Sequence, residues 1–131
     1  MKEYILDTNA LLRFLRNDIP AQAVEVDELF QSAQDGLAII TIYPFVILEA
    51  MYVLWKQYGH EKNDVAAQLV IIVDNPLFDV REKDALREAL TEWSRGAISF
   101  VDAYLLFQSR QENKTLFTFD LKLKKAFRRL Q

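Results

Sequence analysis

Two acidic residues of this chain directly follow short apolar runs of the kind that forms buried strands. Asp7 comes after residues 4–6, and Asp120 comes after residues 116–119. In a parallel sheet the carboxyl ends of the strands lie at one edge, which is where ligands bind and chemistry takes place. A carboxylate there can bind a metal ion or accept a proton, although Asp7 can also simply cap the helix that follows it.

Two further acids are isolated in apolar segments. Glu49 is the only charged residue in 44–55, and Asp102 is the only one in 98–107. A helix that is apolar nearly all round is buried, and an unpaired buried carboxylate is strongly destabilising unless a cation compensates it. We therefore expect a cation beside each acid, either a metal ion or an Arg or Lys side chain. Asp102 would also lie in the first turn of its helix, where the helix dipole favours an anion.

The order of the predicted elements brings these acids toward one another. The apolar patterns predict strands over 2–6, 37–40, 77–80 and 116–119, and helices over 10–16, 20–34, 44–58, 61–74, 82–93, 99–112 and 121–130. This alternation is typical of an α/β protein, a three-layer α/β/α sandwich with a small parallel sheet of four to five strands. If the strand order is 3-2-1-4, Asp7 and Asp120 flank one crevice.

Composition narrows the chemistry that these acids can perform. The chain has no cysteine and a single histidine, so a zinc site built on thiolate or imidazole ligands is excluded. Carboxylates that share a cleft repel one another, and a divalent cation relieves this repulsion. Hard oxygen ligands favour Mg²⁺ or Mn²⁺, which can lower the pKa of a bound water and orient a phosphodiester.

The remaining composition is that of an ordinary globular protein. It is 51% hydrophobic and 27% charged, and we expect a single domain over residues 1–131. No apolar run reaches the roughly 20 residues that a membrane-spanning helix needs, and no signal peptide is visible, so we expect a cytoplasmic protein.

The four acids, in this order, resemble the motifs of the PIN domain family. The motifs are Asp7-Thr8-Asn9, Glu49 in an apolar helix, Phe100-Val101-Asp102-Ala103 and Thr118-Phe119-Asp120. Chain length and element order are similar to those of VapC-type toxins of type II toxin–antitoxin modules. The resemblance covers essentially the whole chain, although Gln131 follows the last helix too closely for the extra edge strand that many PIN domains carry.

The resemblance implies a Mg²⁺- or Mn²⁺-dependent endoribonuclease. Asp7 and Asp102 would be the most direct metal ligands, and Glu49 and Asp120 would complete the acidic pocket as water-mediated ligands or by activating water. Asn9 and Thr118 would orient the carboxylates. Expected partners are an RNA substrate, with transfer RNA as a candidate, a cognate VapB-type antitoxin that covers the cleft, and a second copy of the chain. The apolar helical hairpin over residues 43–73 is the candidate dimer interface.

The basic C-terminal end suggests where RNA binds. Residues 1–109 hold nine Lys and Arg against seventeen Asp and Glu, whereas residues 110–131 hold seven against two. Lys122, Lys125 and Arg129 share one face of the last predicted helix and could hold RNA phosphates. Arg13 and Arg16, which follow Asp7, could do the same, although a plain surface role remains open for both.

Two other functions remain open at this stage. A PIN-like protein could bind RNA or a protein partner without cutting, although such a member would be expected to lose some of the four acids. A phosphohydrolase could use Asp7 as its nucleophile. Enzymes of the haloacid dehalogenase type usually carry a second Asp two residues later, and this chain has Asn9 there.

Overall fold

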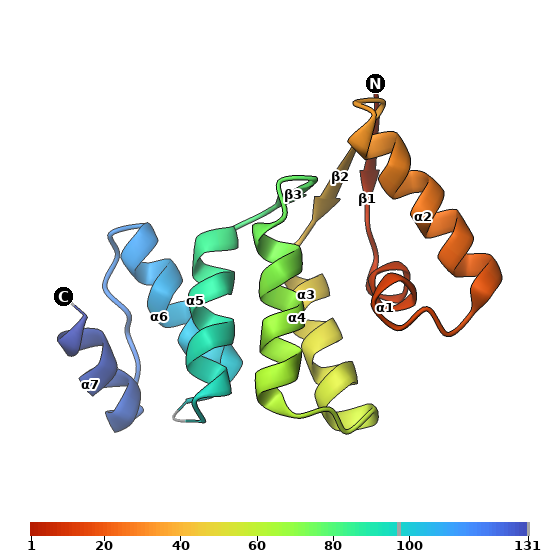
Figure 1. Ribbon diagram of the computed structural model, residues 1–131. Helices are drawn as coiled ribbons and strands as arrows, with labels where there is room; N and C mark the ends of the chain where they lie inside the picture. The colour runs from red at the N-terminus through yellow and green to blue at the C-terminus, as the bar shows by residue number, and fades with distance from the viewer. Residues whose placement is uncertain (97, 131) are drawn as a thin grey trace.

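The computed structural model describes residues 1–96 and 98–130, and its sheet has three parallel strands in this range (Figure 1). The strands are β1 (Lys2–Ile5), β2 (Ala38–Ile42) and β3 (Phe78–Val80), in the order β1-β2-β3. Tyr4 pairs with Ile40, and Thr41 pairs with Asp79. The predicted α/β class and parallel pairing are confirmed, and the three strands follow the predicted order 3-2-1.

The helices also follow the predicted order. They are α1 (Thr8–Arg16), α2 (Pro20–Gln34), α3 (Pro44–Tyr52), α4 (Lys62–Asp74), α5 (Lys83–Ser94), α6 (Phe100–Gln111) and α7 (Leu121–Arg129). The helix predicted over 44–58 is α3 continued by a π-helical turn, η1 (Val53–Gln57). Gly59 then turns the chain with a φ of 70°, a backbone conformation that glycine adopts without steric cost.

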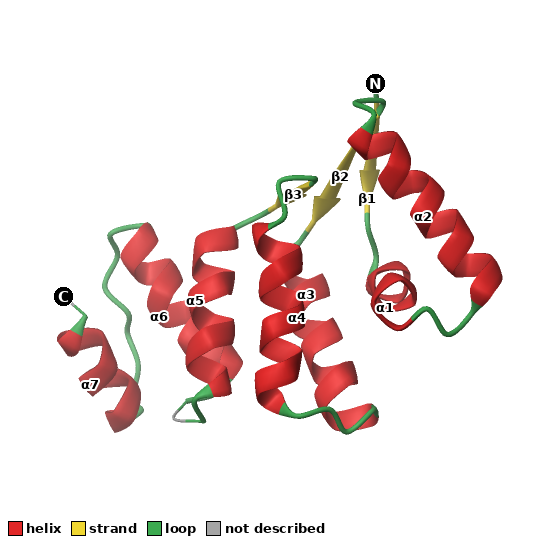
Figure 2. Cartoon of the chain, in the orientation of Figure 1, coloured by secondary structure: helices red, strands yellow, loops and turns green. Residues whose placement is uncertain are grey.

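The predicted fourth strand is absent from the sheet. Residues 114–118 have no regular secondary structure, and Figure 2 draws this stretch as the connection between α6 and α7. Phe117 and Phe119 are each 84% exposed, and their rings meet edge to face with centroids 5.5 Å apart. The expectation of four to five strands is therefore wrong for the described residues. Strand propensity reflects how well a residue fits a half-buried surface, and it does not supply a partner strand.

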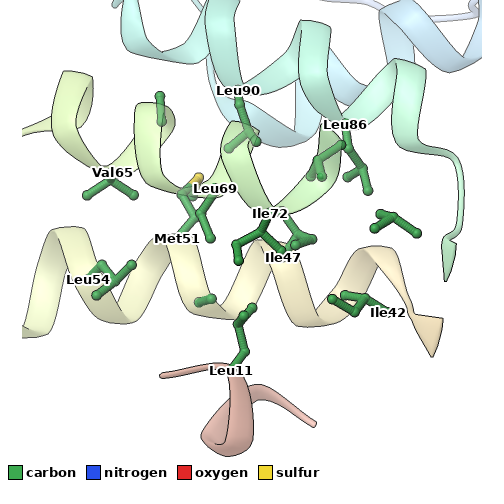
Figure 3. Packing of buried hydrophobic residues seen from close by; sticks show 14 of the residues in the cluster. Leu11, Ile42, Ile47, Met51, Leu54, Val65, Leu69, Ile72, Leu86 and Leu90 are labelled. Carbon is green, nitrogen blue, oxygen red and sulfur yellow. The ribbon is translucent and has the colours of Figure 1, made fainter. Parts of the chain in front are cut away.

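The main core joins the sheet to the helices on either side of it. Figure 3 shows Leu11 of α1 on one side of α3, and Met51 of α3 beside Leu69 of α4 on the other side, and all three are fully buried. The rings of Trp55 and Trp93 pack edge to face with centroids 5.2 Å apart, Trp93 in the core and Trp55 partly buried against it. These contacts fix α1 and α3, whose first turns border the candidate site.

A second apolar cluster holds the C-terminal helix. Leu123 and Ala126 of α7 are buried against Leu106 and Phe107 of α6 and Ala85 of α5. The apolar side of the last helix therefore packs inward. Figure 1 shows that α7 lies at one end of the molecule, whereas β1, α1 and α2 lie at the other end.

The hairpin over residues 43–73 uses most of its apolar side chains in the core. Val65, Leu69 and Val73 are each no more than 1% exposed, whereas Ile71 on the same helix is 67% exposed. The apolar excess that marked this hairpin as a dimer interface is thus accounted for by packing within the chain. No helix within the described part of the chain combines the length and apolar character needed to cross a bilayer.

Replacing Leu69 by Ala should destabilise the fold by about 3 kcal/mol, because it leaves a cavity at a fully buried position between α3 and α5. Ile71→Ala on the same helix is the matched control, since its side chain is in water and the expected change is under about 0.5 kcal/mol. Urea unfolding followed by circular dichroism measures both. Equal effects in the two variants would contradict this packing.

Candidate active site

The structure brings Asp7, Asn9 and Glu49 to one pocket of about 530 Å³. Asp7 lies between the end of β1 and the start of α1, Asn9 lies in the first turn of α1, and Glu49 lies on α3. The remaining lining residues are Thr8, Phe45, Val46, Leu48 and Tyr52. Because α1 packs against α3, two carboxylates that are 42 positions apart in the sequence share a pocket with an apolar wall.

Asp7 is held in place by the helix that it begins. Its Oδ1 accepts a hydrogen bond from the Ala10 backbone N–H at 2.8 Å, so Asp7 is the N-cap of α1. The capping role considered for this residue is therefore confirmed. A carboxylate has two oxygens with several acceptor positions, so the cap leaves Asp7 able to bind a ligand as well.

The sequence predicted a buried environment for Glu49, and this prediction is wrong. It is exposed, and its neighbours on the same face of α3, Phe45 and Tyr52, are 82% and 43% exposed. The surrounding sequence is apolar, but α3 is covered by the core only on the side of Ile47 and Met51. Because Glu49 is exposed, its carboxylate does not need a cation to offset the cost of burial. A cation beside Glu49 is instead expected because Glu49 shares a pocket with Asp7.

Asp102 does not line this pocket. It is half-buried in the first turn of α6, where its backbone N–H donates to the Ser99 Oγ at 3.2 Å. The same turn contributes Phe100 and Val101 to an apolar pocket of about 350 Å³. That pocket shares Phe45 and Leu48 with the Asp7 pocket, so the two are neighbours.

Asp120 does not line the Asp7 pocket. It is the N-cap of α7, with its Oδ1 accepting from the Leu123 backbone N–H at 2.9 Å. Thr118 was expected to orient the carboxylates, and its Oγ1 instead accepts from the backbone N–H of Asp120 at 3.1 Å. Since residues 116–119 do not pair with β1, the predicted crevice between the first and fourth strands does not form within the chain, and α7 lies far from β1 (Figure 1).

The donor set in the Asp7 pocket suits a hard cation. No group of three or more acidic, histidine or cysteine side chains that could hold a metal ion occurs in residues 1–96 and 98–130. Mg²⁺ is nevertheless commonly bound by one or two carboxylates while it keeps several water ligands. Asp7 and Glu49, with the amide oxygen of Asn9, therefore fit Mg²⁺ or Mn²⁺ better than an ion that requires a complete protein cage.

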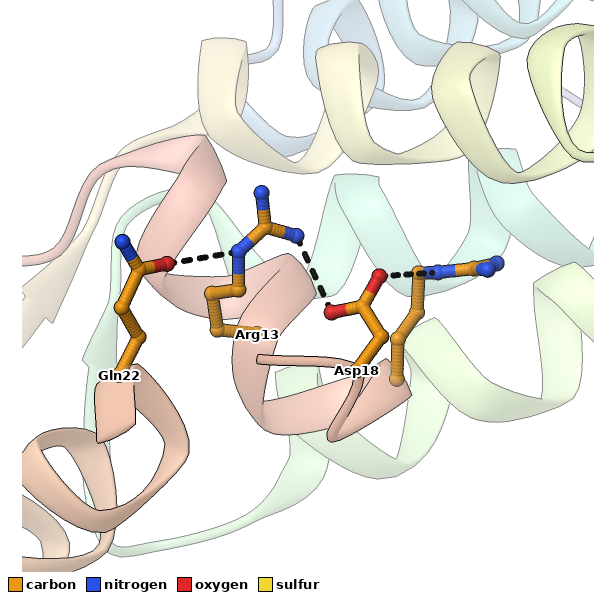
Figure 4. Close-up of polar contacts among 4 residues, drawn as sticks. Arg13, Asp18 and Gln22 are labelled. Atoms are coloured by element: carbon orange, nitrogen blue, oxygen red, sulfur yellow. Dashed lines mark hydrogen bonds and ion pairs between the residues drawn. The ribbon is translucent and has the colours of Figure 1, made fainter. Parts of the chain in front are cut away.

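Arg13 and Arg16 make contacts within the chain (Figure 4). The Asp18 carboxylate forms ion pairs with Arg13, at 3.2 Å from Nη1, and with Arg16, at 3.1 Å from Nε. Arg13 Nε also donates a hydrogen bond to the Gln22 side-chain oxygen at 2.8 Å. The hydrogen bond from Arg16, helped by the charges of both arginines, holds the pKa of Asp18 below its usual value. RNA would have to compete with Asp18 for these two cations.

Lys122, Lys125 and Arg129 line one groove of about 350 Å³. Glu92 of α5 and Ile98 also line it, which places the groove where α7 packs on the rest of the chain. The expected alignment of these three cations on one face of the last helix is therefore present in the fold. Like Asp120, they lie at the end of the molecule remote from the Asp7 pocket (Figure 1).

Residues 4–128 match the family model described as PIN domain. This chain belongs to the PIN domain family. The PIN domain is also 29% identical over 99 residues to a VapC ribonuclease of Aquifex aeolicus (strain VF5), an alignment that covers 75% of this chain and 72% of that protein. Both findings agree with the resemblance drawn from the four acidic motifs.

Two lining residues of the PIN domain pocket were not identified as functional from the sequence. Phe45 and Tyr52 are absent from the predicted site residues, yet both line the pocket that holds Asp7 and Glu49. Their spacing around Glu49, four residues before it and three after it, is the signal that places all three on one helix face.

Proposed function

We propose that this PIN domain is a divalent-metal-dependent endoribonuclease and the toxin of a toxin–antitoxin pair. The observation that carries the proposal is the convergence of Asp7, Asn9 and Glu49 at the carboxyl end of β1. Membership of the PIN family and the similarity to a VapC ribonuclease support RNA as the substrate. Asp102 and Asp120 are proposed to belong to the same acidic site because they match the motifs of the PIN family, although neither lines the pocket.

We infer a task for each of three polar residues of the pocket, Asp7, Asn9 and Glu49. Asp7 and Glu49, with Asn9, would hold Mg²⁺ or Mn²⁺, and the ion when bound neutralises the phosphate and acidifies a coordinated water. The cap on α1 fixes the Asp7 carboxylate, so the ligand is oriented before the ion arrives. Glu49 is exposed to solvent, and one of its carboxylate oxygens accepts the proton of the attacking water.

The aromatic wall of the pocket suits unpaired RNA. The Phe45 ring is largely in water, and Tyr52 is partly so, within the same pocket as the two carboxylates. Bases of single-stranded nucleic acid stack on such rings without strong sequence preference. We infer that the scissile phosphate lies in a single-stranded region, as in a transfer RNA loop. We further propose that the protein acts in the cytoplasm, where a cognate VapB-type antitoxin covers this pocket.

The decisive experiment compares matched RNA and DNA. A labelled single-stranded RNA and the DNA of the same sequence are incubated with the purified chain and Mg²⁺, and the products are separated on a denaturing gel. Shortened RNA with intact DNA is expected. Transfer RNA, ribosomal RNA and messenger RNA are then compared to identify the substrate class. An RNA that stays intact under all these conditions would refute the proposed function.

One observation favours a non-catalytic alternative. Asp102 and Asp120 lie outside the pocket, so a single chain gathers two of the four acids there. A PIN-like module that binds RNA without cutting it would need no complete acidic site. Gel-shift binding of RNA that persists in Mg²⁺, with no shortened product, would support this alternative.

The basic groove on α7 gives a separate prediction about affinity. Replacing Lys122, Lys125 and Arg129 together by Glu should weaken RNA binding and reduce the slope of log K against log salt by about 2, because three phosphate contacts to a single strand are lost. Fluorescence anisotropy over a salt series measures both quantities. Lys83→Glu, at the exposed start of α5, is the control. An unchanged slope in the triple variant would show that this groove does not bind RNA.

A further inference from the structure

One aromatic ring close to the candidate active site holds two lysine side chains. Lys56 Nζ lies 4.0 Å from the centroid of the Trp55 ring, and Lys62 Nζ lies 4.9 Å from it. Trp55 and Lys56 belong to η1, and Lys62 is the first residue of α4, so the turn at Gly59 brings the two lysines to one ring. The π-system of an indole attracts ammonium groups, which keeps both charges together at one place on the surface.

The ring holds these two charges without neutralising them. Trp55 carries no charge, and in the part of the chain that the structure describes neither lysine belongs to an ion pair. Glu61 and Asp64 are the acids nearest to Lys62 in the sequence, and they form no ion pair with it either. Lys56 is exposed and Lys62 is half-buried. The pair is therefore a local excess of positive charge.

Tyr52 connects the lysine pair to the pocket of Asp7 and Glu49. The Tyr52 ring lines that pocket, and its centroid lies 6.1 Å from that of Trp55. Tyr52 is the last residue of α3, and η1 begins at the next residue. A π-helical turn such as η1 is uncommon and occurs frequently at functional sites. The rings of Tyr52 and Trp55 thus form a path from the two carboxylates to the two lysines.

We propose that Lys56 and Lys62 form a phosphate clamp for the RNA strand that enters the pocket, with Trp55 as the residue that positions both ammonium groups. Lysine binds phosphate as a point charge, and two lysines on one ring give a local charge of +2 toward the backbone. A base beside the scissile phosphate stacks on the partly exposed Tyr52 ring, and a neighbouring phosphate lies at the lysines. The identity of the strand rests on the proposed function.

The clamp supplies a charge that the acidic pocket lacks. Asp7 and Glu49 repel a phosphate backbone, and the pocket has no basic lining residue. The two arginines of α1 are already paired with one aspartate. The basic groove on α7 lies at the other end of the molecule (Figure 1). Lys56 and Lys62 are therefore well placed to hold RNA while its neighbouring phosphate reaches the carboxylates.

A salt series measures the clamp without any cleavage. Binding of a labelled single-stranded RNA is followed by fluorescence anisotropy in excess chelator, which stops a metal-dependent reaction. Lys56→Gln/Lys62→Gln should weaken binding and reduce the slope of log K against log salt by about 1.4, because two phosphate contacts to a single strand are lost. Lys56→Arg/Lys62→Arg should bind as the wild type does, because arginine keeps the charge and also stacks on indole.

Lys2→Gln/Lys114→Gln is the matched control for the loss of two positive charges. Lys2 Nζ also lies over an aromatic ring, 5.2 Å from the centroid of Tyr4, but at the amino end of β1. Lys114 Nζ is already paired with Glu112 at 2.6 Å. The control should keep the wild-type slope. The clamp is wrong if both double variants lose the same slope, or if Lys56→Gln/Lys62→Gln loses none.

Cleavage kinetics in Mg²⁺ separate binding from chemistry. The clamp holds a phosphate away from the reacting atoms, so Lys56→Gln/Lys62→Gln should raise KM and leave kcat unchanged. The same salt slope corresponds to a rise in KM of up to about 25-fold at 0.1 M salt. Wild-type cleavage with an unchanged KM and slope in the variant would overturn the clamp and keep the proposed function. RNA binding that needs both lysines, with no cleavage by the wild type, would refute the proposed function and keep the clamp.

Substitution of Trp55 tests its positioning role. Trp55→Phe keeps an aromatic face for the two ammonium groups and should keep KM close to that of the wild type, whereas Trp55→Leu should raise KM as the loss of the lysines does. Melting temperatures identify the variants that are folded. A folded Trp55→Leu chain with the wild-type KM would remove Trp55 from the clamp, and a rise in KM that Trp55→Phe does not share supports it.

Discussion

Replacing Asp7 by Asn is expected to lower the rate of RNA cleavage by about 10³-fold, the range typical of groups that act directly on the reacting atoms or their water. Asn is chosen because it caps helices as well as Asp does, so the hydrogen bond to the Ala10 N–H at the start of α1 is retained. The variant then differs from the wild type mainly in the charge that it offers to a metal ion.

The measurement is the initial rate of cleavage of a labelled RNA at saturating Mg²⁺. Asp27→Asn is the control, since Asp27 is an exposed acid on α2 and its substitution changes net charge by the same amount. The melting temperatures of both variants are compared with that of the wild type. A correctly folded Asp7→Asn chain that cleaves RNA at the wild-type rate would remove Asp7 from the active site.

Removal of divalent metal is expected to lower cleavage by a similar factor, about 10³-fold. Asp7 and Glu49 share a pocket, and without a cation their charges repel the phosphates of RNA as well as each other. The chain is treated with a chelator and dialysed, and cleavage is assayed before and after titration with Mg²⁺ or Mn²⁺. Full recovery is expected with either ion, because both accept oxygen ligands.

Metal binding can be followed independently of cleavage. Isothermal titration with Mn²⁺ should show binding to the wild type and at least roughly tenfold weaker binding to Glu49→Gln, which keeps the size of the side chain but removes its charge. Glu61→Gln, on the exposed residue that precedes α4, is the matched control. Undiminished cleavage in excess chelator would contradict a metal-dependent mechanism.

The local structure of this chain follows closely from its sequence. The apolar patterns predicted most of the element order, and Pro44 at the start of α3 and Gly59 after η1 mark two of the boundaries in the sequence. Asp7 was predicted as a possible cap and is one. These features depend on residues within one or two helical turns of each other, so they can be inferred from short stretches of sequence.

The parts of the site that were predicted wrongly depend on contacts between distant residues. The apolar sequence around Glu49 indicated burial, but the exposure of a helix face is set by which elements cover it, and no described element covers the face of Phe45 and Glu49. Residues 116–119 have the composition of a strand, but strand pairing needs a partner edge that lies elsewhere in the fold.

The sequence alone determined the PIN family, the helices, three of the strands and the acidic residues available to bind a metal ion. Only the tertiary structure decided that Asp7 and Glu49 share a pocket and that Asp102 and Asp120 do not line it. The physical reason is that propensity and periodicity act locally, whereas convergence of side chains depends on how whole elements pack.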